Sequence, residues 1–249
     1  MDDSKPDLVG GPRAGGVSRY PGVHPFDDGE IHRRLFRGRD REKYELLQLV
    51  VAERLVLVFA RSGIGKTSLL NAGLLEPLRD EGYFPLVVRL GASTGSPLDS
   101  VYEGIRTAVD AASAQRQIEY EPPQTGWNRA SLWHFFKTLE IWRGDRLLSP
   151  VLLIDQFEEL FTLHDPEPRK AFIDELADLV RGTRPRRPLD GTATKLSDTP
   201  PEVKVVLALR EDFYANLEEL RDRIPSIYKA PFRVKPLSRE QARRAIVEP

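Results

Sequence analysis

A lysine and a threonine stand side by side at positions 66 and 67, directly after a short segment with glycines at 63 and 65. In a loop of this pattern, backbone N–H groups bind phosphate oxygens, the lysine reaches the β- and γ-phosphates, and the hydroxyl binds Mg²⁺. Phosphate loops more often begin with glycine, but they also use alanine, as at Ala60. The alternative is an ordinary glycine turn between a strand and a helix. The pattern predicts a nucleoside triphosphate site formed by Ala60, Arg61, Ser62, Gly63, Ile64, Gly65, Lys66, Thr67 and Ser68.

Such a site also needs an acidic residue on a neighbouring strand, on the metal side of the phosphates. Asp155 follows four apolar residues at 151–154, so we expect it to act with Thr67 on Mg²⁺. Glu158 and Glu159 come next, at the turn into a short helix. One of them could activate the attacking water as a general base. Alternatively, both simply favour a helix N-terminus. The sequence does not choose between the two glutamates.

Arg210 ends another apolar run, at residues 205–209. The carboxyl ends of parallel strands line the ligand crevice of an open sheet. A guanidinium there is well suited to pair with γ-phosphate oxygens. The alternative is a surface ion pair with Glu211 or Asp212. Together these patterns predict a catalytic set of Lys66, Asp155, Glu158, Glu159 and Arg210.

The elements that must position these residues form an alternating series. Short apolar runs without polar alternation are typical of strands that are covered on both faces. Strands alternating with helices favour right-handed crossovers in a doubly wound sheet. We therefore expect an α/β fold, a three-layer α/β/α sandwich with a mostly parallel sheet. The expected strands are residues 55–59, 84–90, 150–154, 203–209 and 232–234, and the expected helices are 40–53, 67–81, 97–114, 129–143, 160–163 and 169–181.

The remaining segments suggest how the chain is divided. Residues 1–19, rich in Gly, Pro, Asp and Ser, are expected to be a disordered tail. The nucleotide-binding core is expected at residues 20–237. Within it, 118–127 is expected to be a surface loop, and the proline-rich segment 182–201 an exposed loop.

The composition of the 249-residue chain is that of a globular protein, with 40% hydrophobic and 30% charged residues. A formal net charge of −1 gives no support for a nucleic-acid or membrane partner. Without cysteine there are no disulfides and no thiolate chemistry, and the four histidines have no metal-binding spacing. There is no long apolar run and the N-terminus is polar and acidic, so we expect a soluble cytoplasmic protein.

Several stretches, in this order, are similar to those of one protein family. They are Tyr-Pro-Gly-Val-His-Pro-Phe at 20–26, Leu-Phe-Arg-Gly-Arg-Asp at 35–40, the segment 62–75, Asp-Gln-Phe-Glu-Glu-Leu-Phe at 155–161, Leu-Arg-Glu-Asp-Phe at 209–213 and the segment 232–242. Over residues 20–249 the chain resembles the novel STAND NTPases. The stretch at 155–161 is the most specific of these similarities, because phosphate loops occur in many families.

The resemblance implies a STAND/AAA-like P-loop ATPase that transduces a signal. Such proteins rest with ADP bound, exchange it for ATP on a trigger, self-associate, and turn over slowly. It also implies that Gly38 and Arg39 lie near the adenine and ribose, and that residues 238–249 begin a truncated helical lid. The family's sensor or effector region is not found in this chain, which we therefore expect to be a fragment; the alternative is a short product that needs partners. The preference for adenine rests on the resemblance alone.

Two other functions remain open at this point. One is a nucleic-acid-associated AAA-like ATPase, which would need a basic surface that the near-neutral charge does not favour. The other is a module that binds nucleotide without hydrolysing it. Such a module would be indifferent to Glu158→Gln and Glu159→Gln.

Overall fold

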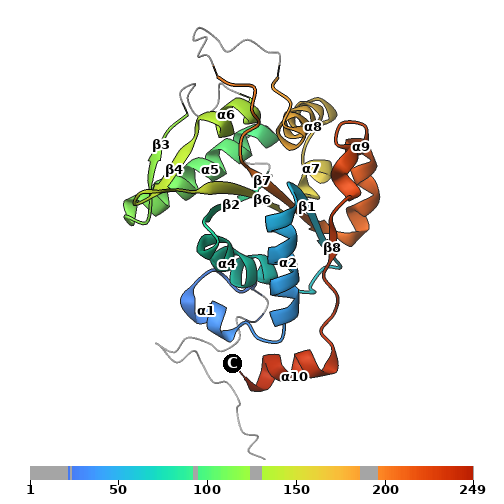
Figure 1. Cartoon of the computed structure of the whole chain (residues 1–249). Coiled ribbons are helices and arrows are strands. Elements are labelled where there is room, and N and C mark those ends of the chain that lie inside the picture. Colours follow the sequence, from blue (N-terminus) through green and yellow to red (C-terminus); the bar gives the residue numbers. More distant parts are fainter. Residues whose placement is uncertain (1–21, 23, 92–94, 124–130, 186–195, 249) are drawn as a thin grey trace, which may run out of the picture.

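A computed structural model of the chain describes residues 22, 24–91, 95–123, 131–185 and 196–248. Its centre is a five-stranded sheet in the order β2-β6-β7-β1-β8, and every strand pair in it is parallel (Figure 1). The strands are β1 (Leu55–Ala60), β2 (Tyr83–Arg89), β6 (Ser149–Asp155), β7 (Lys204–Arg210) and β8 (Pro231–Arg233). The predicted α/β class is confirmed, and each predicted strand is present with its ends shifted by at most one residue.

Helices cover both faces of this sheet. On one face lie α2 (Asp40–Ala52) and α4 (Leu75–Asp80), with α1 (Glu30–Leu35) beyond them. On the other lie α5 (Pro97–Ala114), α6 (Leu132–Thr138) and α8 (Pro166–Arg181). The shorter elements are α3 (Lys66–Ser68), the π-helical turn η1 (Leu69–Leu74), α7 (Glu159–Thr162), the 3₁₀ turns η3 (Glu211–Leu217) and η4 (Pro225–Tyr228), α9 (Glu218–Arg221) and α10 (Arg239–Val247).

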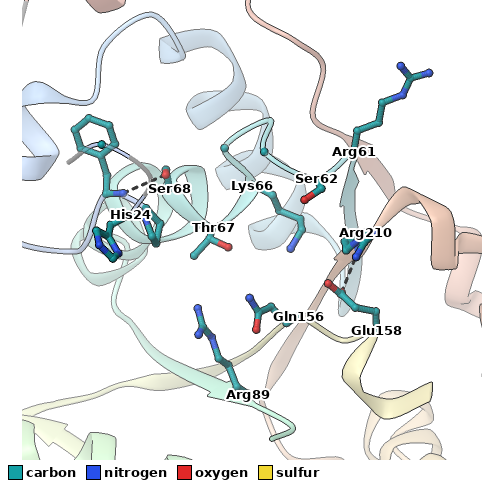
Figure 2. Close-up of a pocket in the computed structure, with 15 residues that line it drawn as sticks. His24, Arg61, Ser62, Lys66, Thr67, Ser68, Arg89, Gln156, Glu158 and Arg210 are labelled. Atoms are coloured by element: carbon teal, nitrogen blue, oxygen red, sulfur yellow. Dashed lines mark hydrogen bonds between the residues drawn. The ribbon is translucent and has the colours of Figure 1, made fainter. Parts of the chain in front are cut away.

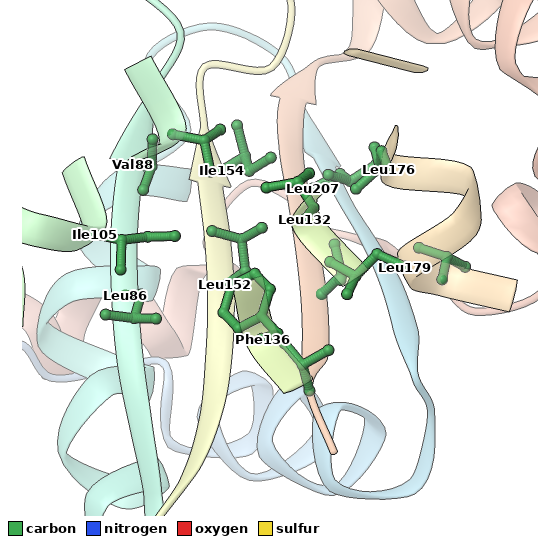
Figure 3. Packing of buried hydrophobic residues seen from close by; sticks show 14 of the residues in the cluster. Leu86, Val88, Ile105, Leu132, Phe136, Leu152, Ile154, Leu176, Leu179 and Leu207 are labelled. Atoms are coloured by element: carbon green, nitrogen blue, oxygen red, sulfur yellow. The ribbon is translucent and has the colours of Figure 1, made fainter. Parts of the chain in front are cut away.

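The strands are apolar throughout because both of their faces are buried. Along β1, Leu55 and Leu57 join the apolar cluster under α5, α6 and α8, whereas Val56 and Val58 join the cluster under α2 and α4. Successive side chains of a strand point to opposite faces, so a strand between two helical layers needs an unbroken apolar run. Figure 3 shows the first cluster, in which Leu152 and Ile154 of β6 lie among side chains from the neighbouring strands and helices.

Capping residues set the limits of the longest helices. Ser96 accepts a hydrogen bond from the Asp99 N–H at 3.2 Å, and Pro97 is the first residue of α5, as predicted. Helix α8 begins at Pro166, three residues before the predicted start, and ends at Arg181, where it is capped by Gly182, whose φ is 68°. The predicted helix at 67–81 is helical over its length except for its last residue, but it contains a π-helical turn that the sequence did not indicate.

One predicted helix, at 129–143, is wrong in its second half. The chain leaves α6 at Thr138 and forms β4 (Glu140–Arg143), which pairs with β3 (Glu119–Glu121) and β5 (Arg146–Leu147) in a small antiparallel sheet. In β4 buried Ile141 lies between exposed Glu140 and half-buried Trp142, an alternation too short to distinguish a strand from a helix in the sequence. Strand β3 lies within the predicted loop 118–127, so that prediction is wrong there too.

Other predicted segments fall partly or wholly outside the described residues. The predicted tail, 1–19, and residues 124–127 and 186–195 of the two predicted loops are among them. Where the described chain resumes after 195, Arg184 binds Asp198 at 2.8 Å and the Leu196 carbonyl at 3.1 Å. Within the described ranges, no helix combines the length and the apolar character needed to cross a bilayer.

Candidate nucleotide-binding site

The loop between β1 and α3 is a strand-to-helix turn that carries the predicted phosphate-binding residues. Gly63 and Gly65 have φ values of 77° and 92°, in the left-handed region where a side chain would be strained. The turn brings Lys66 to the start of α3, and its side chain is only 9% exposed. The loop thus has the strand, glycine turn and helix context that a phosphate loop requires.

Asp155 joins this loop to the end of β6. Its Oδ1 accepts a hydrogen bond from Lys66 Nζ at 3.1 Å, and its Oδ2 accepts one from the Thr67 hydroxyl at 3.0 Å. Arg89, at the end of β2, places Nη2 3.6 Å from the same Oδ2. The Asp155 side chain is 3% exposed, so this carboxylate is buried among two cations and a hydroxyl. The three sequence segments meet because β2, β6 and β1 end at the same edge of the parallel sheet.

A cavity of about 800 Å³ opens in front of these groups (Figure 2). This volume is within the range of small-molecule sites, about 300–1,000 Å³. Its lining comes from the phosphate loop, three strand ends and an N-terminal segment: Gly22, His24, Pro25, Phe26, Arg61, Ser62, Gly63, Gly65, Lys66, Thr67, Ser68, Arg89, Gln156, Glu158 and Arg210. Of the predicted residues, Asp155 lies behind Lys66 and Thr67, and Ala60, Ile64 and Glu159 are outside the lining.

The two glutamates have different surroundings. Glu158 lines the cavity, and its Oε2 accepts a hydrogen bond from the Arg210 backbone N–H at 3.1 Å. Glu159 begins α7, and its buried Oε2 has no hydrogen-bond partner among the described residues. Burial raises the pKa of Glu159 above its ordinary value, and nearby Arg89 opposes this shift. Of the two glutamates, only Glu158 therefore lines the cavity.

Arg210 lines the cavity at the end of β7, as its position in the sequence suggested. Its guanidinium forms an ion pair with Asp212 and lies 5.6 Å from the centre of the Phe213 ring. The side chain is 45% exposed. Arg210 thus forms the surface ion pair with Asp212 that the sequence left open as an alternative, and it also lines the cavity.

Gly38 and Arg39 lie outside the cavity lining. Arg39 is buried, and its guanidinium donates to the carbonyls of Lys235 at 2.7 Å and Ile64 at 2.9 Å. A side chain at Gly38, where φ is 82°, would come within 2.4 Å of the Gln241 carbonyl of α10. These two residues connect the phosphate loop to the segment that leads into α10.

Sequence reasoning missed two cavity residues at strand ends. Arg89 is not among the predicted site residues, although its place at the carboxyl end of a predicted strand was a usable signal. Gln156 follows Asp155 with a φ of 57°, a left-handed conformation that is uncommon for glutamine, and nothing in the sequence indicates it. Its side chain lies between Arg89 and Lys66 in Figure 2.

The fold and the site together define a P-loop NTPase. The family profile described as Novel STAND NTPase 1 matches residues 20–249. The chain belongs to the novel STAND NTPases, as its sequence stretches suggested, and forms a nucleotide-binding NTPase module.

Solved structures share the fold at low sequence identity. A Walker-type ATPase of Pyrococcus abyssi has a TM-score of 0.54 and 15% identity, with 90% of this chain and 59% of that chain covered. The ORC2 protein of Aeropyrum pernix, in ADPNP–ADP complexes, has a TM-score of 0.50 and 14% identity, with 87% and 50% covered. The chain thus spans 59% of the length of the first protein and 50% of the length of the second. No curated protein matches the sequence.

Proposed function

We propose that this chain is the ATP-binding and slowly hydrolysing switch module of a signalling ATPase. It would hold ADP at rest and ATP in a self-associated state, with its sensor or effector region outside these residues. The family supports the switch, and the cavity supports a nucleotide as its ligand. Slow turnover suits such a role, because the ATP state must persist while an assembly forms.

The observation that carries this proposal is the Asp155 carboxylate between Lys66 and Thr67. A buried carboxylate is stable only when it is paired and hydrogen-bonded. Here the partners are the two side chains whose spacing marks a phosphate loop, at 3.1 and 3.0 Å. The same geometry leaves Lys66 at the cavity surface, where its ammonium can turn to phosphate oxygens.

The residues also fit a magnesium ion. Thr67 Oγ1 in the cavity lining and Asp155 Oδ2 behind it are hard oxygen donors that lie 3.0 Å apart. Mg²⁺ typically takes one or two protein oxygens and completes its shell with phosphates and water, so this small donor set is sufficient. When bound, the ion would neutralise charge on the β- and γ-phosphates. Thr67 and Asp155 would hold it.

The other side chains have roles that follow from their positions. Backbone N–H groups at 61–68 would bind the phosphates, with Lys66 on the β- and γ-oxygens. Glu158 would orient and deprotonate the attacking water, since it faces the cavity and Glu159 does not. Arg210 would exchange its ion pair with Asp212 for the γ-phosphate, which makes it a sensor of ATP against ADP.

The resting state can be tested by identifying the nucleotide that the protein carries. The protein is purified without added nucleotide and denatured, and the released nucleotide is identified by chromatography. We expect about one ADP per chain from the wild type and almost none from Lys66→Ala. Release of no nucleotide from the wild type, or of equal amounts from both proteins, would contradict the proposed resting state.

A further inference from the structure

An N-terminal segment closes one end of the cavity. His24, Pro25 and Phe26, which we call the strap (residues 24–26), all line it. The strap is fixed to the helix that follows the phosphate loop: the Phe26 N–H donates to Ser68 Oγ at 3.1 Å, and Asn71 Nδ2 donates to the Phe26 carbonyl at 3.3 Å. The strap is thus attached beside the phosphate loop, across more than forty residues of sequence.

The cavity has two chemically different ends. Asp155, which pairs with Lys66, and Glu158 and Arg210, at the ends of β6 and β7, mark the side where the terminal phosphate would be cleaved. Ser68 lies on the opposite side, one residue beyond Thr67, and carries the strap. In Figure 2, His24 and Ser68 lie on one side of Lys66, and Arg210 and Glu158 lie on the other. A nucleotide with its γ-phosphate toward Glu158 must extend its ribose and base toward the strap.

We infer that the strap forms the nucleoside wall of the site, with the His24 imidazole against the base. This inference rests on the proposed nucleotide-binding function. Base faces stack on aromatic side chains, including histidine, and such stacking tolerates different bases. His24 is exposed to the cavity and forms no hydrogen bond with another described residue.

Phe26 has a different role, because its ring is already packed. It lies 5.4 Å, centre to centre, from both the His32 and the Phe36 rings. It therefore anchors the strap, and Asn71 positions the strap from behind without lining the cavity.

The test compares two ligands that share the phosphates and differ in the nucleoside. Nucleotide-stripped protein is titrated calorimetrically with ADP and with pyrophosphate, both in Mg²⁺. We expect His24→Ala to weaken ADP binding about ten-fold, the lower part of the range for one base–aromatic stack, and to leave pyrophosphate within about two-fold. His24→Phe should restore the affinity for ADP, because it restores an aromatic face.

Two further variants separate a local effect from a general one. Asn71→Ala releases the strap's carbonyl and should weaken ADP more than pyrophosphate. Tyr44→Ala removes an exposed ring from α2, outside the cavity, and should change neither affinity. Equal losses of both ligands in His24→Ala, or no loss of either, would overturn the inference. A wild type that bound neither ligand would instead refute the proposed function, on which the inference depends.

Discussion

Exchange of Glu158 for glutamine should separate nucleotide hydrolysis from nucleotide binding. The substitution keeps the size of the side chain and removes the carboxylate that faces the cavity. A positioned general base contributes about 100- to 10,000-fold to a rate. We therefore expect Glu158→Gln to lower ATP turnover by at least about 100-fold, with the affinity for ADP within about two-fold of the wild type.

The structure also limits the effect on stability. Glu158 Oε2 accepts the Arg210 backbone N–H at 3.1 Å, and the amide oxygen of glutamine can still accept it. A hydrogen bond to a charged acceptor contributes about 1.5–3 kcal/mol, and one to a neutral acceptor about 0.5–1.5 kcal/mol. The difference, about 1 kcal/mol, corresponds to a fall of about 2–4 °C in the unfolding midpoint for a chain of this size. The variant should remain folded.

The matched control is Glu159→Gln, the same change one residue further along and outside the cavity lining. Phosphate release under single-turnover conditions, ADP titration and thermal unfolding are measured for both variants. We expect the Glu159→Gln variant to hydrolyse ATP at a rate within about three-fold of the wild type, because Glu159 does not act as the general base. If turnover is lost in Glu159→Gln and kept in Glu158→Gln, our choice of base is wrong.

Three other predictions concern stability. Burial raises the pKa of Glu159 above 4.5, so its stabilising contribution is fully present below about pH 4.5 and is lost as the pH rises through the folded-state pKa. Glu159→Gln should accordingly unfold at a higher temperature than the wild type at pH 7 and lose this advantage near pH 4; equal midpoints at pH 7 would contradict the burial argument. Gln156→Gly should stabilise the chain against urea by about 1 kcal/mol, because glycine adopts the left-handed backbone conformation without strain, but it should slow turnover. A destabilised variant would show that the backbone at this φ of 57° is not strained. Leu207→Ala in central strand β7 should lower the free energy of unfolding by about 2–5 kcal/mol in the same assay. A decrease below about 1 kcal/mol would mean that the surrounding core closes around the missing side chain.

Most of the central fold could be predicted, because the strands are buried on both faces and their apolar runs are unambiguous. Leu152, Leu153 and Ile154, for example, cannot form a half-exposed strand, so they indicate a covered parallel sheet. The small β3-β4-β5 sheet was missed because its strands have two to four residues, too few to show a period.

The candidate site was predictable where chemistry requires a fixed spacing. Lys66, Thr67 and Asp155 met as expected because parallel strands end at one edge of the sheet. The strap could not be placed, since its contacts with Ser68 and Asn71 come from segments more than forty residues away. The left-handed conformation of Gln156 depends on the local turn, and no residue type there signals it.

The most direct test of the central claim is a calorimetric titration of nucleotide-stripped protein with ATP and Mg²⁺, for the wild type and Lys66→Ala. Loss of one charge-assisted contact to the phosphates corresponds to about 1.5–3 kcal/mol, or roughly a 10- to 150-fold loss of affinity. We predict stoichiometric binding to the wild type and a loss of this size in Lys66→Ala. Equal affinity in both proteins, or no binding to the wild type, would contradict the assignment of this cavity as a nucleotide site.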